Sequence, residues 1–179
     1  QRASAVPGKK QRVTRAVAAF DQVPSRRADD QTTVTVARRV PEDATVIGIP
    51  VATDGDVPRE RLDLDRATLE ASGFGAKVGE TLVLPRAEGP TIVEIGVGPR
   101  GALDAAAVRD AAAAFARAAV KHERLAIDLT GVVSDLEART VGQAVVEGVL
   151  MARYRYRAFV DKASEAHLRA LTLVTSSDR

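Results

Sequence analysis

The sequence contains no cysteine and no tryptophan, and Phe and Tyr together supply only six of its 179 residues. Without cysteine, disulfides, thiolate zinc sites and cysteine nucleophiles are excluded, and the composition fits a cytoplasmic protein. With so few aromatic side chains, the core must be built from Val, Leu, Ile and Ala. That composition suits a largely parallel sheet covered by helices.

Long apolar runs are also missing. No uninterrupted apolar stretch approaches the roughly 18 residues of a membrane-spanning helix. The basic residues near the N-terminus have no apolar segment behind them, so we expect neither a secretory signal nor a membrane contact.

The net positive charge of the chain arises in its first 32 residues. This leader holds seven Lys or Arg and three Asp residues, a net charge of +4, whereas the rest of the chain carries −2. Residues 10–20 could form a short helix with Val13, Val17 and Phe20 on one face. We interpret residues 1–32 as a solvated basic extension, because it lacks the interleaved aromatics of many nucleic-acid binders; nucleic-acid binding is the alternative.

Residues 33–179 predict one α/β domain. The pattern of β-branched and alternating segments predicts, in order, strands at 33–37 and 45–52, a short helix at 66–72, strands at 81–84 and 90–98, a helix at 104–121, a strand at 123–131, a helix at 136–152 and a strand at 168–176. This alternation predicts a mixed, mostly parallel sheet between helical layers.

One stretch has the glycine pattern of dinucleotide-binding loops. Gly96, Gly98 and Gly101 satisfy G-x-G-x-x-G between a predicted strand and a predicted helix, and Asp128 lies near the position expected for a ribose-binding acid. However, Pro99 removes one backbone donor from the loop, and Asp104 is the best N-cap candidate. An N-cap carboxylate would occupy the amides that a phosphate needs, so we interpret the pattern as a turn.

Other candidate chemistry is sparse. An acidic stretch could suggest a metal site, but it lacks the ordered ligand pattern of a calcium loop and is interpreted as a surface loop; its acids are Asp54, Asp56, Glu60, Asp63 and Asp65. The two histidines, His122 and His167, have no partner at ligand spacing, and His122 is expected to favour the helix dipole when charged. Ser72 in ASGFG is not a nucleophile elbow.

The alternation YRYR at 154–157 is interpreted as a helix end, with Tyr154 packing inward and the arginines reaching solvent; nucleic-acid contact is the alternative. The residues themselves define no catalytic, cofactor-binding or metal site.

Three stretches together resemble the N-terminal domain of the cytosol (leucyl) aminopeptidase family. GFGAKVGETLVLP at 73–85 resembles the glycine-rich segment before a central strand, and EIGVGPRGALDAAAVRDAAAAFARA at 94–118 resembles the strand, turn and alanine-rich helix that follow. VVEGVLMARYRYRAFVDK at 145–162 resembles the last helix of that domain. It matches at Glu147, Gly148, Leu150, Tyr154, Arg155 and Tyr156, and departs at Met151, Ala152 and Arg153.

The resemblance implies a macro-domain-like three-layer α/β/α sandwich and a two-domain parent enzyme. In that family the two divalent metals (manganese or zinc), the catalytic lysine and the Asn-Thr-Asp-Ala-Glu-Gly-Arg signature belong to the C-terminal domain. No position here matches those residues, so the implied cofactors, the peptide substrates and the hexamer core belong to the parent. The alternative is a stand-alone macro-like module that binds ADP-ribose or a related nucleotide.

Overall fold

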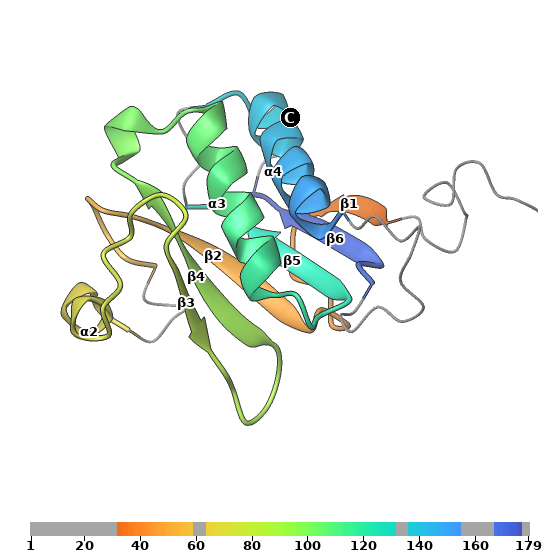
Figure 1. Ribbon diagram of the computed structural model, residues 1–179, viewed down its shortest axis with the longest axis horizontal. Coiled ribbons are helices and arrows are strands. Elements are labelled where there is room, and N and C mark those ends of the chain that lie inside the picture. Colours follow the sequence, from red (N-terminus) through yellow and green to blue (C-terminus); the bar gives the residue numbers. More distant parts are fainter. Residues whose placement is uncertain (1–31, 59–63, 132–135, 155–166, 177–179) are drawn as a thin grey trace, which may run out of the picture.

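The computed structural model describes residues 32–58, 64–131, 136–154 and 167–176 (Figure 1). Residues 1–31 of the basic leader, with the helix expected at 10–20, lie outside the described residues, and so do Arg155 and Tyr156. The described elements, in chain order, are β1 (Thr33–Ala37), β2 (Val46–Ala52), α2 (Arg66–Ala71), β3 (Thr81–Leu84), β4 (Thr91–Gly98), the 3-10 helix η3 (Arg100–Ala102), α3 (Ala105–Ala118), β5 (Arg124–Asp128), α4 (Ala138–Arg153) and β6 (Ala170–Val174).

The six described strands form one mixed sheet with the order β1-β6-β5-β2-β4-β3. All neighbouring strands are parallel except β3, which pairs antiparallel to β4 at one edge. This is the mixed, mostly parallel α/β sheet that the sequence predicts. Because β2 and β4 are parallel neighbours, their carboxyl ends lie at the same edge of the sheet, where open α/β folds usually bind ligands.

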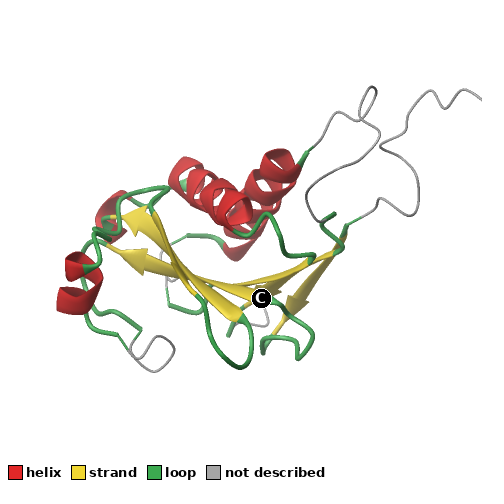
Figure 2. Cartoon of the chain, turned by 60° about the horizontal axis from the view of Figure 1, so that its bottom comes forward, coloured by secondary structure: helices red, strands yellow, loops and turns green. Residues whose placement is uncertain are grey.

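One face of the sheet is covered by α3 and α4, which lie side by side (Figure 2). The buried residues between them form the main core, which includes Ile95, Phe115, Leu125, Val145 and Leu171, all 1 % exposed or less. The alanine-rich sequence of α3 brings its backbone close to its neighbours. The alternation predicted for 123–131 is confirmed, because Leu125, Ile127 and Leu129 all point into this core.

The opposite face is covered by a shorter part of the described chain. Helix α2 and the segment after it pack on β2 and β4 and form a smaller cluster, here called the second-face cluster, of Ile49, Val51, Leu69, Phe74, Ala76 and Ile92. The helix begins at the N-cap Asp65, whose carboxylate accepts from the Thr68 amide at 2.8 Å. The described chain is therefore an α/β sandwich with a thick helical layer on one face and a thin cover on the other.

Two expectations for the helix ends are wrong. Tyr154 does not pack inward, because its side chain is 65 % exposed beyond the end of α4. Helix α3 ends at Ala118 rather than at residue 121, so His122 lies beyond its last turn. Burial and the nearby Arg153 charge both lower the pKa of His122, so the cationic form does not support the helix dipole as the sequence suggested.

Arg153 takes that place instead. Its guanidinium reaches from the end of α4 to carbonyl oxygens at the end of α3, donating to Ala119 at 2.7 Å, to His122 at 2.9 Å and to Ala116 at 3.4 Å. The Ala116 and Ala119 carbonyls lie in the last turn and at the C-cap of α3, at the negative end of its dipole, and Ala119 also accepts from the His122 amide at 2.9 Å. Arg153 is one of the positions at which the sequence departs from the family pattern, and the departure joins the two helix ends.

We expect Arg153→Met to lower the free energy of unfolding by about 2 kcal/mol, because it leaves the α3 carbonyls without a charged donor. The same change should raise the pKa of His122, since it removes a neighbouring positive charge. Urea denaturation and NMR titration of the imidazole measure the two effects. Arg117→Met, which removes an exposed basic residue in the last turn of α3, is the matched control and should change both much less.

Candidate functional site

The carboxyl edge of the sheet is the place to look for a ligand site in this fold. Here the turn after β4 lies beside the turn after β2 (Figure 1). Asp54, in the turn after β2, accepts a hydrogen bond at 2.8 Å from the amide of Arg100, in the turn after β4, and so links the two turns. The site must therefore be judged from these two turns and from the helix N-terminus that follows.

The glycines of the G-x-G-x-x-G pattern have separate structural positions. Gly96 and Gly98 belong to β4, and Gly98 ends that strand with a φ of +76°, a conformation that favours glycine. Gly101 lies in η3, before α3 begins. The helix therefore starts too late for its N-terminus to be part of the glycine loop, unlike in a dinucleotide-binding fold.

Carboxylates occupy the amides that a phosphate would use. The predicted N-cap is confirmed, because the Asp104 carboxylate accepts from the Ala107 amide at 2.8 Å. With Asp54 on the Arg100 amide, two negative charges lie along this turn. They satisfy the donors and repel an anion, which supports the interpretation of the pattern as a turn.

The candidate ribose-binding acid is also engaged. Asp128 ends β5, is 4 % exposed and accepts from the Thr130 amide at 3.0 Å and the Thr130 hydroxyl at 2.7 Å. These contacts form a local turn of the kind that short polar side chains make with the following backbone.

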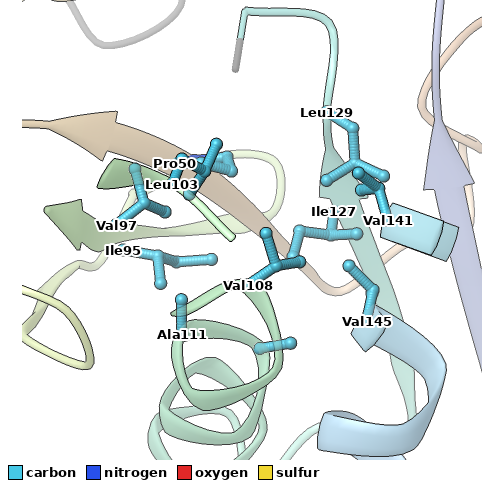
Figure 3. A pocket seen from close by; sticks show the side chains of 11 residues that line it. Pro50, Ile95, Val97, Leu103, Val108, Ala111, Ile127, Leu129, Val141 and Val145 are labelled. Atoms are coloured by element: carbon cyan, nitrogen blue, oxygen red, sulfur yellow. The ribbon is translucent and has the colours of Figure 1, made fainter. Parts of the chain in front are cut away.

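Beneath the same turns lies a small apolar pocket (Figure 3). It is lined only by apolar residues of the sheet, the turn and the two helices, among them Pro50, Val97, Leu103, Leu129 and Val141. Its internal volume is about 20 Å³, which is room for about one water molecule. The pocket offers no polar group to a nucleotide, a peptide or a metal ion.

The described acids of the acidic stretch serve separate turns, and the two histidines precede the paired strands β5 and β6. Asp54 and Asp65 each accept backbone hydrogen bonds at different turns, while Glu60 and Asp63 lie outside the described residues. His167 has a buried Nε2 without a hydrogen-bond partner in the described part of the chain. Among the residues that the structure describes, no group of three or more His, Cys, Asp or Glu could hold a metal ion.

Sequence reasoning missed one unusual residue, Glu94. Its side chain is fully buried in the centre of β4, and neither carboxylate oxygen has a hydrogen-bond partner among the described residues. Burial raises the pKa of Glu94 from 4.5 to about 7. The signal was present in the sequence, because this is the one charged residue in the apolar run TIVEIGVG.

The sheet topology is that of a macro-like α/β domain. Among the described residues, the carboxyl edge of its sheet carries no recognisable group of catalytic side chains. A profile described as the cytosol aminopeptidase family, N-terminal domain, matches residues 64–163. The chain therefore belongs to the cytosol aminopeptidase family, in agreement with the resemblance noted in its sequence. No curated protein matches the chain in sequence.

Solved structures agree with this assignment. The bottromycin maturation enzyme BotP in complex with Mn is 29 % identical, with a TM-score of 0.59 over 74 % of this chain and 27 % of that protein. A mutant tomato leucine aminopeptidase is 16 % identical, with a TM-score of 0.65 over 80 % of this chain and 32 % of the other. The chain thus spans about a quarter to a third of the length of these enzymes.

The fold also resembles a macrodomain. The macrodomain of Mycobacterium tuberculosis DarG is 14 % identical, with a TM-score of 0.56 over 80 % of this chain and 99 % of that domain. At this identity the likeness concerns the fold alone, and it confirms the macro-like α/β architecture. Within the described residues, none of the helices is long and apolar enough to cross a membrane.

Proposed function

We propose that this chain is the non-catalytic N-terminal domain of a cytoplasmic dimetal aminopeptidase, which releases N-terminal residues from peptides. The observation that carries the proposal is the match of residues 64–163 to the N-terminal domain of that family. The chain also spans only 27 % to 32 % of related enzymes, one of them in complex with Mn. In this proposal a C-terminal domain supplies two manganese or zinc ions, and the parent assembles as a hexamer.

In the parent, one metal would polarise the scissile carbonyl and the pair would supply hydroxide at neutral pH. In this proposal the residues described here contribute a scaffold to that enzyme. At the carboxyl edge Asp54, Asp104 and Asp128 all serve turns or a helix cap, so their role is structural. This domain would then support assembly or substrate access rather than bond cleavage.

The first experiment is to read the source gene beyond Arg179 and to express the complete product beside this chain. Both are assayed for hydrolysis of a leucyl amide with added Mn²⁺ or Zn²⁺. We expect hydrolysis by the complete product and none by the present chain. Metal-dependent hydrolysis by the chain alone would refute the proposed division of labour.

A nucleotide-binding module is the second candidate, and the whole-domain likeness to the DarG macrodomain is what favours it. Thermal unfolding with and without ADP-ribose separates the two functions, because a ligand that binds the native state raises the midpoint. We expect no shift, since carboxylates occupy the amides of the turn after β4. A clear rise would support the nucleotide-binding module instead.

A further inference from the structure

Glu94 lies in the middle of β4, directly between two neighbouring strands. Its register partners are Ile49 in β2 and Leu82 in β3. Because side chains alternate along a strand, Glu94 shares a face with Ile92 and points to the second-face cluster, away from the main core. A fully buried carboxyl in such surroundings strongly prefers to be neutral.

Residues 66–80 lie over this face of the sheet and are here called the cover. It consists of α2 and the following segment, and it contributes Leu69, Phe74 and Ala76 to the second-face cluster. All three side chains are 3 % exposed or less. The cover therefore packs on the face of the sheet to which Glu94 points, where the side chain is fully buried.

The described charged side chains on the elements around Glu94 bind other groups or face solvent. Strands β2 and β3 carry no charged residue. In the cover, the Arg66 guanidinium donates to the carbonyls of Ala52 and Gly55, both at 3.0 Å, and the Glu80 carboxylate accepts from the Gly75 and Lys77 amides. The remaining charged residues of the cover, Glu70 and Lys77, are exposed. Desolvation is accordingly the cause of the raised pKa of Glu94.

The cover packs on the sheet through fewer buried apolar side chains than the helices on the other face do. Beyond its apolar contacts, three backbone hydrogen bonds join its second half to β4: Gly98 to Ala76 at 3.0 Å, Gly96 to Glu80 at 2.8 Å, and Gly79 to Gly96 at 3.1 Å. Ala76 has a φ of +57°, which costs conformational energy for a residue with a Cβ atom. The second-face cluster is also much smaller than the main core and lies across the sheet from it. Such a unit can open locally without unfolding the rest.

We propose that Glu94 makes closure of the cover sensitive to pH: the cover packs on the sheet while the carboxyl is protonated and opens when the carboxyl loses its proton to solvent. Opening brings water to the carboxylate, which the closed state cannot do. The main core, on the far side of the sheet, stays packed. This device is independent of the proposed peptidase role.

The sign follows from proton binding. Between the ordinary pKa of 4.5 and the value of about 7 in the closed state, the closed state binds more protons than the open one. Closure is therefore strongest below pH 4.5, weakens as pH rises through 7, and changes little above that.

Hydrogen exchange of the full 179-residue chain, corrected for intrinsic exchange at each pH, tests the proposal. We expect the opening equilibrium of cover and β4 amides, such as Phe74, Gly96 and Gly98, to increase more than tenfold from pH 5.5 to pH 7.5. Amides on the other face of the sheet, such as that of Val108 in α3 and that of its C-cap residue Ala119, should change little.

Glu94→Gln is the matched control, because it keeps the shape and removes the ionisation; its cover should open to the same extent at all these pH values. If that variant does not fold, Glu94→Leu serves, with a permanently closed cover expected. A flat profile in the wild-type chain would overturn the proposal. An unchanged profile in either variant would also overturn it, because another titrating group would then be responsible. A parallel change in α3 would do the same, because it would indicate a global effect.

Discussion

Gly148→Ala should lower the free energy of unfolding by about 3 kcal/mol, because the two main helices touch at this glycine. A Cβ atom at position 148 in α4 would overlap the Arg109 carbonyl of α3 and lie 3.1 Å from both the Ala112 Cβ and the Ala113 amide nitrogen. Two of these three atoms are backbone, so they cannot move aside without separating the helices from each other. Urea denaturation with an unchanged m-value would measure the loss.

Gly142→Ala in the same helix is the matched control. A Cβ atom there would meet only the Leu173 Cδ1, at 3.9 Å, which is ordinary van der Waals contact. Since alanine favours a helix over glycine, this variant should gain about 0.5 to 1 kcal/mol. Equal effects of the two substitutions would contradict the close contact between α3 and α4.

Gly96→Ala should also lower the free energy of unfolding by about 3 kcal/mol or more, and the local structure should be lost mainly in the cover. The added Cβ would overlap the Lys77 carbonyl and lie 2.6 Å from the Ala76 carbonyl carbon. These are backbone atoms of the cover, which also accepts and donates hydrogen bonds at Gly96 and Gly98. We expect urea denaturation to show the loss, and hydrogen exchange to show the largest increase at residues 74–80.

Gly101→Ala removes the third glycine of the same pattern and is the control. No atom lies within 4 Å of a Cβ built at Gly101, and its φ is not in the left-handed region. The change in unfolding free energy should stay within about 0.5 kcal/mol. A large loss from this variant, or none from Gly96→Ala, would show that the spacing of the glycines serves some purpose other than packing.

The glycine pattern shows how far the candidate site could be judged from sequence. Pro99 and Asp104 sufficed to predict that the helix starts late and that a carboxylate caps it, because capping depends on a few neighbouring residues. The role of Asp54 was out of reach, since it bonds an amide 46 residues away. The same holds for Gly96, which must be glycine because the backbone carbonyl of Lys77 in the cover lies against it.

Most of the fold follows from local patterns. The order and type of the strands and main helices, the buried stripe of α3 with Val108, Ala112 and Phe115, and the Asp104 cap are all confirmed. The helix ends were predicted less well, because the sequence pattern continues past Ala118 while the backbone turns there towards β5. Tyr154 is exposed since α4 ends beside it, a boundary that its aromatic character does not reveal.

By itself, the sequence determined the core composition, the alternating α/β order and the family, because each depends on residues close together in the chain or on their order along it. Only the tertiary structure decided the strand order, the Arg153 contacts between helix ends, and the need for glycine at positions 96 and 148. It also decided that Glu94 is buried on a face closed by the cover. These properties depend on atoms that distant segments bring together, and no short-range pattern of polar and apolar residues encodes such contacts.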